Sequence, residues 1–369
     1  MKIAICGWYG AGNLGDEAIL SAIIEGVRTR IPDCTFHVFS KNPDRTSSDH
    51  QVESSSLKLL ALPRSLEILK GCDAFILGGG VFLHKYSSSL KWMSRPTIAQ
   101  MMRIPVVFYA LGVDRTVLQS RGAKRLIGGV AKRAKVIIVR DENSRDVLLE
   151  MGVKEPIEVT VDPVFSMSPP PEERIDSILR SENLDPSRYV LVCPGFPGYR
   201  WDQIDAEKYT KALVTFINHI VESSDAKVVL VPFEVPWDLD FCDQLKQSAG
   251  KGIGINVLQK EYPPKDVIGL FSSSRFVVCS RYHANIFSIM GGVPFVSIMY
   301  LPGKHTPLLD FVGMTGYGTT LEELTSSRLT SQVSHLLESE REIRSMLEQK
   351  KGELKEKADR NVELLLSAL

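Results

Sequence analysis

The chain has 369 residues, more than one hydrophobic core normally serves, so two domains are expected. Its 44 Lys and Arg residues equal its 44 Asp and Glu residues in number, which excludes a strongly basic chain that would bind nucleic acid through its overall field. The six cysteines stand singly, without a CxxC pair, so we expect buried thiols in a reducing compartment and neither a disulfide framework nor a metal site.

No stretch of the sequence predicts a membrane span. The N-terminal run "IAIC" is only about four residues long and ends at a glycine, too short for a signal peptide or a spanning helix. We therefore expect a cytoplasmic protein.

Short apolar runs alternate with helix-length segments along the chain, as in a parallel sheet that is covered on both faces. The β-rich apolar runs, with the residues that directly follow them, lie at 2–6, 35–40, 73–80, 105–112, 135–141, 157–162, 189–195, 227–233, 254–259, 276–283 and 294–300. This pattern predicts an α/β protein with two Rossmann-like, doubly wound domains that face a cleft.

Three consecutive prolines, Pro169 to Pro171, interrupt this pattern and favour an extended segment. We therefore predict an N-terminal domain at 1–168, a linker at 169–180 and a C-terminal domain at 181–320. The charged segment 321–369 has helical periodicity and is predicted to form C-terminal helices.

A glycine-rich loop, "GWYGAGNLGDEA", follows the first predicted strand and leads into a helix. It is not a GxGxxG motif, and Asp16 and Glu17 would repel a dinucleotide pyrophosphate. Asp16 and Glu17 instead suit contacts with sugar hydroxyls, and Asp16 could serve as a general base. Asn13 is a further candidate for binding the acceptor. The alternative is that Asp16 only caps the following helix.

The strand "AFIL" ends in the glycines 78–80. Because no Cβ stands in the way, Gly79 and Gly80 would let a ligand or a facing backbone approach closely. A tight turn that packs a helix on the sheet is the structural alternative.

Basic residues recur at the carboxyl ends of three predicted strands. Arg140 follows "VIIV", and Arg281 and His283 follow "FVVCS", just before a helix. Lys304 follows the strand "PFVSIMY". These ends meet at one edge of each sheet, so we expect a cationic pocket for a small anionic ligand, with His283 as a proton donor. For Arg140, an ion pair with Asp141 or Glu142 that merely orders the turn is the alternative.

The blocks "GNLGDEAIL", "FILGGG", "RDENS", "VDPVF" and "SRYHANIFSIMGGVPFVSIMY" occur in an order that resembles the polysaccharide pyruvyl transferase family, over about residues 1 to 315. The resemblance implies a GT-B-like fold and transfer of a pyruvyl group from phosphoenolpyruvate to a sugar of a cell-wall polysaccharide or exopolysaccharide, or of its lipid-linked precursor, as a cyclic ketal. It makes Arg140, Arg281, His283 and Lys304 donor-site residues and assigns Asp16 to the acceptor side. No cofactor is expected.

Three other hypotheses stay open. A GT-B glycosyltransferase or sugar-nucleotide epimerase would need a ribose-binding carboxylate, for which Glu234 is a candidate. A catalytically silent glycan-binding module would tolerate loss of Arg281 and His283. The basic stretch "KRLIGGVAKRAK" at 124–135 would allow peripheral contact with the inner face of a membrane.

Tyr199, Trp201 and Trp237 are candidates for stacking on a sugar acceptor.

Overall fold

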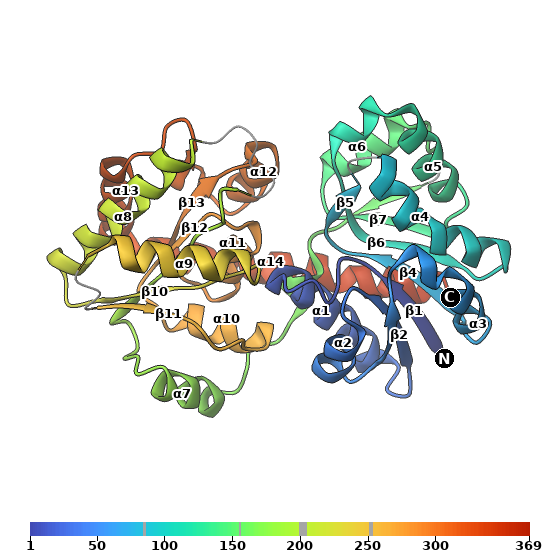
Figure 1. Cartoon of the computed structure of the whole chain (residues 1–369), viewed down its shortest axis with the longest axis horizontal. Coiled ribbons are helices and arrows are strands. Elements are labelled where there is room, and N and C mark those ends of the chain that lie inside the picture. The colour runs from blue at the N-terminus through green and yellow to red at the C-terminus, as the bar shows by residue number, and fades with distance from the viewer. Residues whose placement is uncertain (84–85, 155, 199–204, 251–253) are drawn as a thin grey trace. The chain divides into compact units, whose positions relative to one another are not determined.

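The computed structural model describes residues 1–83, 86–154, 156–198, 205–250 and 254–369. The chain divides into two compact units (Figure 1). The first consists of Met1–Met167 and Leu354–Leu369, and the second of Ser168–Glu353.

The first unit contains an all-parallel sheet with the strand order β3-β2-β1-β4-β6-β7-β8, and β5 pairs with β6 beyond this path. Its strands are β1 (Lys2–Cys6), β2 (Thr35–Ser40), β3 (Glu53–Ser56), β4 (Ala74–Gly78), β5 (Val81–Leu83), β6 (Val106–Val113), β7 (Val136–Val139) and β8 (Ile157–Val159).

Helices connect these strands. They are α1 (Leu14–Arg30), α2 (Pro43–His50), α3 (Leu62–Leu69), α4 (Tyr86–Met101), α5 (Arg121–Ala131) and α6 (Glu142–Glu150), with 3₁₀ turns η1 (Leu59–Ala61), η2 (Arg115–Gln119) and η3 (Pro163–Ser166).

The second unit has its own parallel sheet, ordered β11-β10-β9-β12-β13-β14. In chain order this is 3-2-1-4-5-6, the arrangement of a Rossmann sheet. Its strands are β9 (Tyr189–Cys193), β10 (Lys227–Leu230), β11 (Ile255–Val257), β12 (Val277–Cys279), β13 (Phe295–Met299) and β14 (Gly318–Thr320).

The helices of the second unit are α7 (Glu172–Ser181), α8 (Ala206–Ser223), α9 (Trp237–Ser248), α10 (Pro264–Ser272), α11 (Tyr282–Met290), α12 (Pro302–Phe311) and α13 (Ser326–Glu338), with the 3₁₀ turn η4 (Thr315–Tyr317). The long helix α14 (Glu340–Ser367) begins in the second unit and ends in the first.

The central strands are buried along their whole length, as their continuous apolar sequences predict. Every residue of β4 and β9 is buried, and so are the last four of β1. Helices that cover both faces of a parallel sheet produce this burial. The prediction of two parallel α/β sheets with helices is confirmed, and all six cysteines are free and buried.

The segment predicted as a linker is structured differently. Pro171 is the N-cap of α7, which occupies most of the predicted linker and packs against α10 of the second unit. The prolines precede the helix, and its own residues Ile178 and Leu179 are buried. Its burial therefore makes 172–181 part of the second unit.

Candidate active site

Arg281 and His283 lie at the carboxyl end of β12. Arg281 is the N-cap residue of α11, with extended backbone angles, and His283 lies in the first turn of the helix. The apolar residues of α11 are buried, which fixes the start of the helix against the sheet. Both side chains therefore stand at the edge where parallel sheets bind ligands.

Two carboxylates hold the Arg281 guanidinium. Arg281 Nε donates to Asp238 Oδ2 at 2.9 Å, Nη1 donates to Glu234 Oε2 at 3.0 Å, and Nη2 donates to Asp238 Oδ1. Asp238 is fully buried and also accepts backbone N–H groups of Phe196, Phe233 and Glu234. This network, which the sequence did not reveal, fixes the orientation of the arginine.

The charge balance around Arg281 differs from the prediction. Burial by itself lowers the pKa of Arg281, but Asp238 and Glu234 outweigh burial and raise the pKa above its ordinary value. The predicted cationic pocket assumed arginines without carboxylate partners, and that assumption is wrong for Arg281. The sequence offered one signal: the acids of "FEVPWD" follow the strand "KVVL".

Lys304 and His283 contact the same aromatic ring. Lys304 Nζ lies 4.1 Å from the centre of the Tyr282 ring, and the His283 ring stands edge-on to Tyr282 with 5.7 Å between centres. Lys304 comes from the first turn of α12, after β13. The structure thus brings together Arg281, His283 and Lys304, as predicted, at the neighbouring ends of β12 and β13.

His305 is a site neighbour that sequence reasoning missed. Its ring contacts Tyr282 and Tyr300, with centres 5.6 and 5.2 Å apart, and its Nδ1 is 3.2 Å from the Ser297 hydroxyl oxygen. His305 is 1% exposed. Burial, aided by the Lys304 charge, lowers the pKa of His305 to about 3. His305 is therefore a neutral imidazole, and it directly follows the Lys304 cation in the sequence.

Arg140 follows β7 in the first unit and is also paired. Its Nη1 donates to Asp162 Oδ2 at 3.1 Å, and its Nε lies 3.6 Å from Asp141 Oδ2. Asp141 caps α6 by accepting the Ser144 N–H. The contact with Asp141 agrees with the structural alternative, and Asp162, in the quoted "VDPVF" block, is the closer partner.

Asn13, not Asp16, caps the first helix. Asn13 Oδ1 accepts the N–H groups of Gly15 and Asp16, and α1 begins at Leu14. The alternative that Asp16 caps a helix starting near Glu17 is therefore wrong. Glu17 is buried, accepts the Gly10 N–H and approaches His50 Nε2 at 3.0 Å, which anchors the loop.

Gly79 and Gly80 follow β4 with positive φ angles of 62° and 74°. A Cβ on Gly79 would come within 2.1 Å of Ile19 on α1. The close approach at Gly79 is therefore a contact between the sheet and a helix, the structural alternative considered for this turn.

Two proposed acceptor contacts, Tyr199 and Trp201, lie outside the described residues. Trp237 lies in the first turn of α9, is 45% exposed and stacks on Phe196 with ring centres 6.2 Å apart. Of the three candidates, Trp237 therefore has an exposed indole in the described structure, and it directly precedes Asp238, the partner of Arg281.

The basic stretch 124–135 lies mostly on α5. Ile127, Val130 and Ala131 of this stretch are buried in the core of the first unit, so they are not available to a lipid surface. Within the described ranges, no helix combines the length and apolar character that crossing a bilayer requires.

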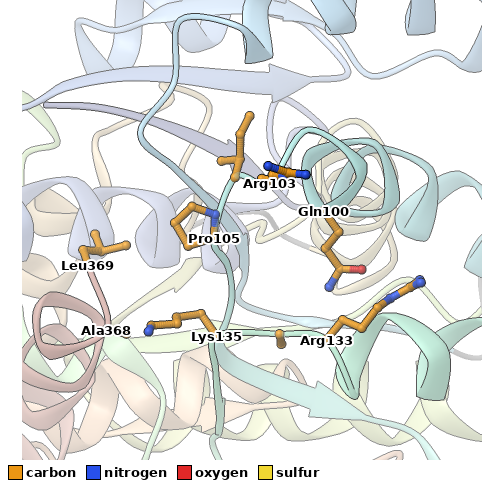
Figure 2. A pocket seen from close by; sticks show the side chains of 9 residues that line it. Gln100, Arg103, Pro105, Arg133, Lys135, Ala368 and Leu369 are labelled. Carbon is orange, nitrogen blue, oxygen red and sulfur yellow. The ribbon is translucent and has the colours of Figure 1, made fainter.

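The first unit contains a pocket of about 570 Å³. Figure 2 shows Arg103, Arg133 and Lys135 among the side chains that line it. It lies next to Pro105 and Lys135, which precede β6 and β7. This is the amino end of the sheet, opposite the edge that carries Arg140, so the cavity is separate from the candidate site.

Solved structures share the fold of the whole chain. HepE from Anabaena in complex with UDP and glucose matches with a TM-score of 0.66 and 14% identity, over 100% of both chains. The UDP-GlcNAc 2-epimerase from Neisseria meningitidis bound to UDP-GlcNAc matches with a TM-score of 0.67 and 13% identity, again over 100% of both chains. A putative UDP-N-acetylglucosamine 2-epimerase from Listeria monocytogenes matches with 0.67 and 11%, over 99% of this chain and 96% of that one. These matches confirm the GT-B-like fold class.

The comparison with family models identifies a sequence relationship. No curated protein matches the chain. The model of the family described as polysaccharide pyruvyl transferase matches residues 13–302, a range that includes Asn13, Asp16, Arg140, Arg281 and His283. The chain therefore belongs to the polysaccharide pyruvyl transferase family.

Proposed function

We propose that this protein transfers the pyruvyl group of phosphoenolpyruvate to a sugar of a cell-surface polysaccharide or its lipid-linked precursor, forming a cyclic ketal and releasing phosphate. The family match supports the reaction class. The observation that carries the proposal is the contact of Lys304 and His283 with one Tyr282 ring, which holds a cation beside an imidazole at a helix N-terminus.

The second unit carries the proposed donor-site residues Arg281, His283 and Lys304. Phosphoenolpyruvate carries a phosphate and a carboxylate, which Lys304 and the N-terminus of α11 would attract. Arg281 uses three N–H groups on Asp238 and Glu234, and a guanidinium has five, so two remain for the donor. In the first unit, Arg140 is the residue proposed to contact phosphoenolpyruvate, and Asp162 holds its side chain.

In the proposed reaction, His283 donates a proton to the methylene carbon of phosphoenolpyruvate, which leaves an oxocarbenium-like centre at the adjacent carbon. One sugar hydroxyl attacks that carbon and loses its proton. The carbon–oxygen bond to phosphate then breaks, with the electron pair leaving on phosphate. A second hydroxyl of the same sugar attacks the same carbon, passes its proton to the released phosphate and closes the ketal. Asp16 in the first unit is the proposed base, with Asn13 and Gly80 as proposed acceptor contacts.

The test is acceptor-dependent phosphate release from phosphoenolpyruvate, measured with a panel of galactosides and N-acetylmannosamine disaccharides. The His283→Ala variant should lose about 10²- to 10⁴-fold in rate, the usual contribution of a general acid. His219, which is exposed on α8, provides the matched control, and His219→Ala should retain full activity. Equal rates in wild type and His283→Ala would remove His283 from the mechanism.

A nucleotide-sugar enzyme is the alternative, and similarity of fold is what supports it. Its proposed ribose-binding carboxylate, Glu234, accepts a hydrogen bond from Arg281. Thermal stabilisation by phosphoenolpyruvate but not by UDP would support the pyruvyltransferase. Stabilisation by UDP alone would favour the alternative. The free, buried cysteines suit a reducing compartment, and we propose that the protein acts in the cytoplasm.

A further inference from the structure

Two lysines and two tryptophans gather in the first unit, at the carboxyl ends of β1 and β2. Lys41 Nζ lies 3.9 Å from the centre of the Trp8 ring, and Lys91 Nζ lies 5.3 Å from Trp8 and 4.9 Å from Trp92. The two indole rings are 5.7 Å apart and tilted by 59°. We call Trp8, Lys41, Lys91 and Trp92 the cation–tryptophan cluster.

The cluster adjoins the loop that carries Asn13 and Asp16. Trp8 stands in this loop, between β1 and α1, and Lys41 directly follows β2. The Lys41 N–H donates to the Tyr9 carbonyl oxygen at 3.0 Å, which ties the two loops together. A Cβ on Gly10, whose φ is 66°, would come within 2.1 Å of the Ser40 hydroxyl oxygen, so the loops are in close contact. Ligands of Rossmann-like sheets bind at this edge.

A third cation, Arg95, lies close to Lys91 of the cluster. Arg95, one helical turn after Lys91 on α4, is fully buried and donates to the carbonyl oxygens of residues 56, 57 and 58. In the described part of the chain, neither Lys91 nor Arg95 forms an ion pair with a carboxylate. A partly buried lysine close to a buried arginine is costly unless an anion binds near it.

The charge state of Lys91 reflects this environment. Burial, and then the Lys41 charge, lowers the pKa of Lys91, with Cys6 opposing and Arg95 adding to the effect. No carboxylate contributes to the shift. A bound anion would favour the charged ammonium and offset this unfavourable arrangement.

We propose that the cation–tryptophan cluster binds an anionic saccharide, a sugar phosphate or a sugar acid, with Lys41 and Lys91 on the anionic group and Trp8 against the sugar ring. Both ammonium groups approach the Trp8 ring, so an anion held between them would leave the attached sugar beside the indole. The identification of this saccharide as the acceptor rests on the proposed pyruvyltransferase function. The proposal that the cluster binds an anionic saccharide does not rest on that function.

The test is isothermal titration of the full chain with glucose 1-phosphate, glucuronate and methyl glucoside. At least one of the two anionic probes should bind more tightly than methyl glucoside, and its binding should weaken as salt rises. The preference for phosphate or carboxylate identifies the anionic group. Lys91→Gln and Lys41→Gln should each weaken the anionic probe about tenfold, the effect of losing one charged hydrogen bond.

Two controls locate the binding site. Lys70→Gln removes an exposed lysine at the end of α3 and should change nothing. Lys304→Gln alters the proposed donor site and should leave the affinity for the anionic probe unchanged. The proposal is overturned if neither anionic probe binds more tightly than methyl glucoside, or if the difference persists in the Lys41→Gln/Lys91→Gln double variant.

A parallel titration with phosphoenolpyruvate separates the two proposals. The double variant should bind phosphoenolpyruvate like wild type. If wild type does not bind phosphoenolpyruvate, yet the anionic saccharide binds in a manner that requires Lys41 and Lys91, the pyruvyltransferase proposal fails and the saccharide site stands.

Discussion

Lys304 Nζ lies 4.1 Å from the centre of the Tyr282 ring, so the ring holds the cation at the start of α11. A cation over an aromatic face contributes about 0.5–2 kcal/mol. Tyr282 thus connects a residue of α12 with the first turn of α11, where His283 stands.

Replacing Tyr282 by leucine should raise the KM for phosphoenolpyruvate about tenfold, because Lys304, a residue of the proposed donor site, loses its aromatic support. Tyr282→Phe keeps the ring face and should stay within about twofold of wild type. Steady-state phosphate release measures both variants. Equal KM values for the leucine and phenylalanine variants would contradict a role for the ring face.

Asp238→Ala should destabilise the second unit by about 3–5 kcal/mol, because it leaves Arg281 without its main partner and removes the acceptor of three backbone N–H groups. Denaturant unfolding monitored by circular dichroism measures the change. Asp240→Ala, in the same turn of α9 but exposed, is the control and should shift stability by less than about 0.5 kcal/mol. A loss as small as that of the control would show that the Arg281 network contributes little.

His305 should make the protein less stable as the pH falls. Its folded-state pKa is lowered to about 3, whereas the unfolded histidine titrates near 6.5, so between these values the unfolded chain binds more protons. The neutral form's full contribution is present above about pH 6.5, and about 2 kcal/mol should be lost from pH 7 to pH 5.

Unfolding free energies measured from pH 7 to pH 5 test this expectation. His305→Asn should flatten the pH dependence, and His219→Asn, on the exposed face of α8, should leave it as in wild type. A pH dependence that is the same in His305→Asn and wild type would contradict the role of the buried imidazole.

Asn361 on α14 should stabilise the first unit and support Arg140. Its Oδ1 accepts the Thr160 hydroxyl at 2.5 Å, and its Nδ2 donates to the Val161 carbonyl oxygen at 3.1 Å, one residue before Asp162. Asn361→Ala removes both of these hydrogen bonds and should cost about 1–3 kcal/mol.

Denaturant unfolding measures this cost. Steady-state kinetics should reveal a raised KM for phosphoenolpyruvate, because Asp162 holds Arg140, a residue of the proposed donor site. Glu363→Ala, which removes only a partly exposed ion pair with Arg30, is the control for α14. A stability loss without any kinetic change would limit Asn361 to a structural role.

The sequence predicted the strands whose apolar runs are long and missed three others. β3 has the sequence "ESSS", and its place in the sheet depends on pairing with β2, where Glu53 lies opposite His37. β5 and β14 have three residues each and carry no periodic pattern. A short or polar strand is recognised by its neighbours in the sheet, which a linear pattern does not contain.

The sequence by itself determined the parallel α/β class and the positions of Arg140, Arg281 and His283 after buried strands, because hydrophobic runs and the residues that end them are local features. Tertiary structure decided which charged side chains surround these three residues. Arg281 follows β12, and its partners Asp238 and Glu234 follow β10, 43 and 47 residues away in the sequence. They meet because β10 and β12 lie on the two sides of β9 in the sheet. Asn13 rather than Asp16 caps α1, and Lys41 and Lys91 converge on Trp8, because packing sets which loops and helices touch.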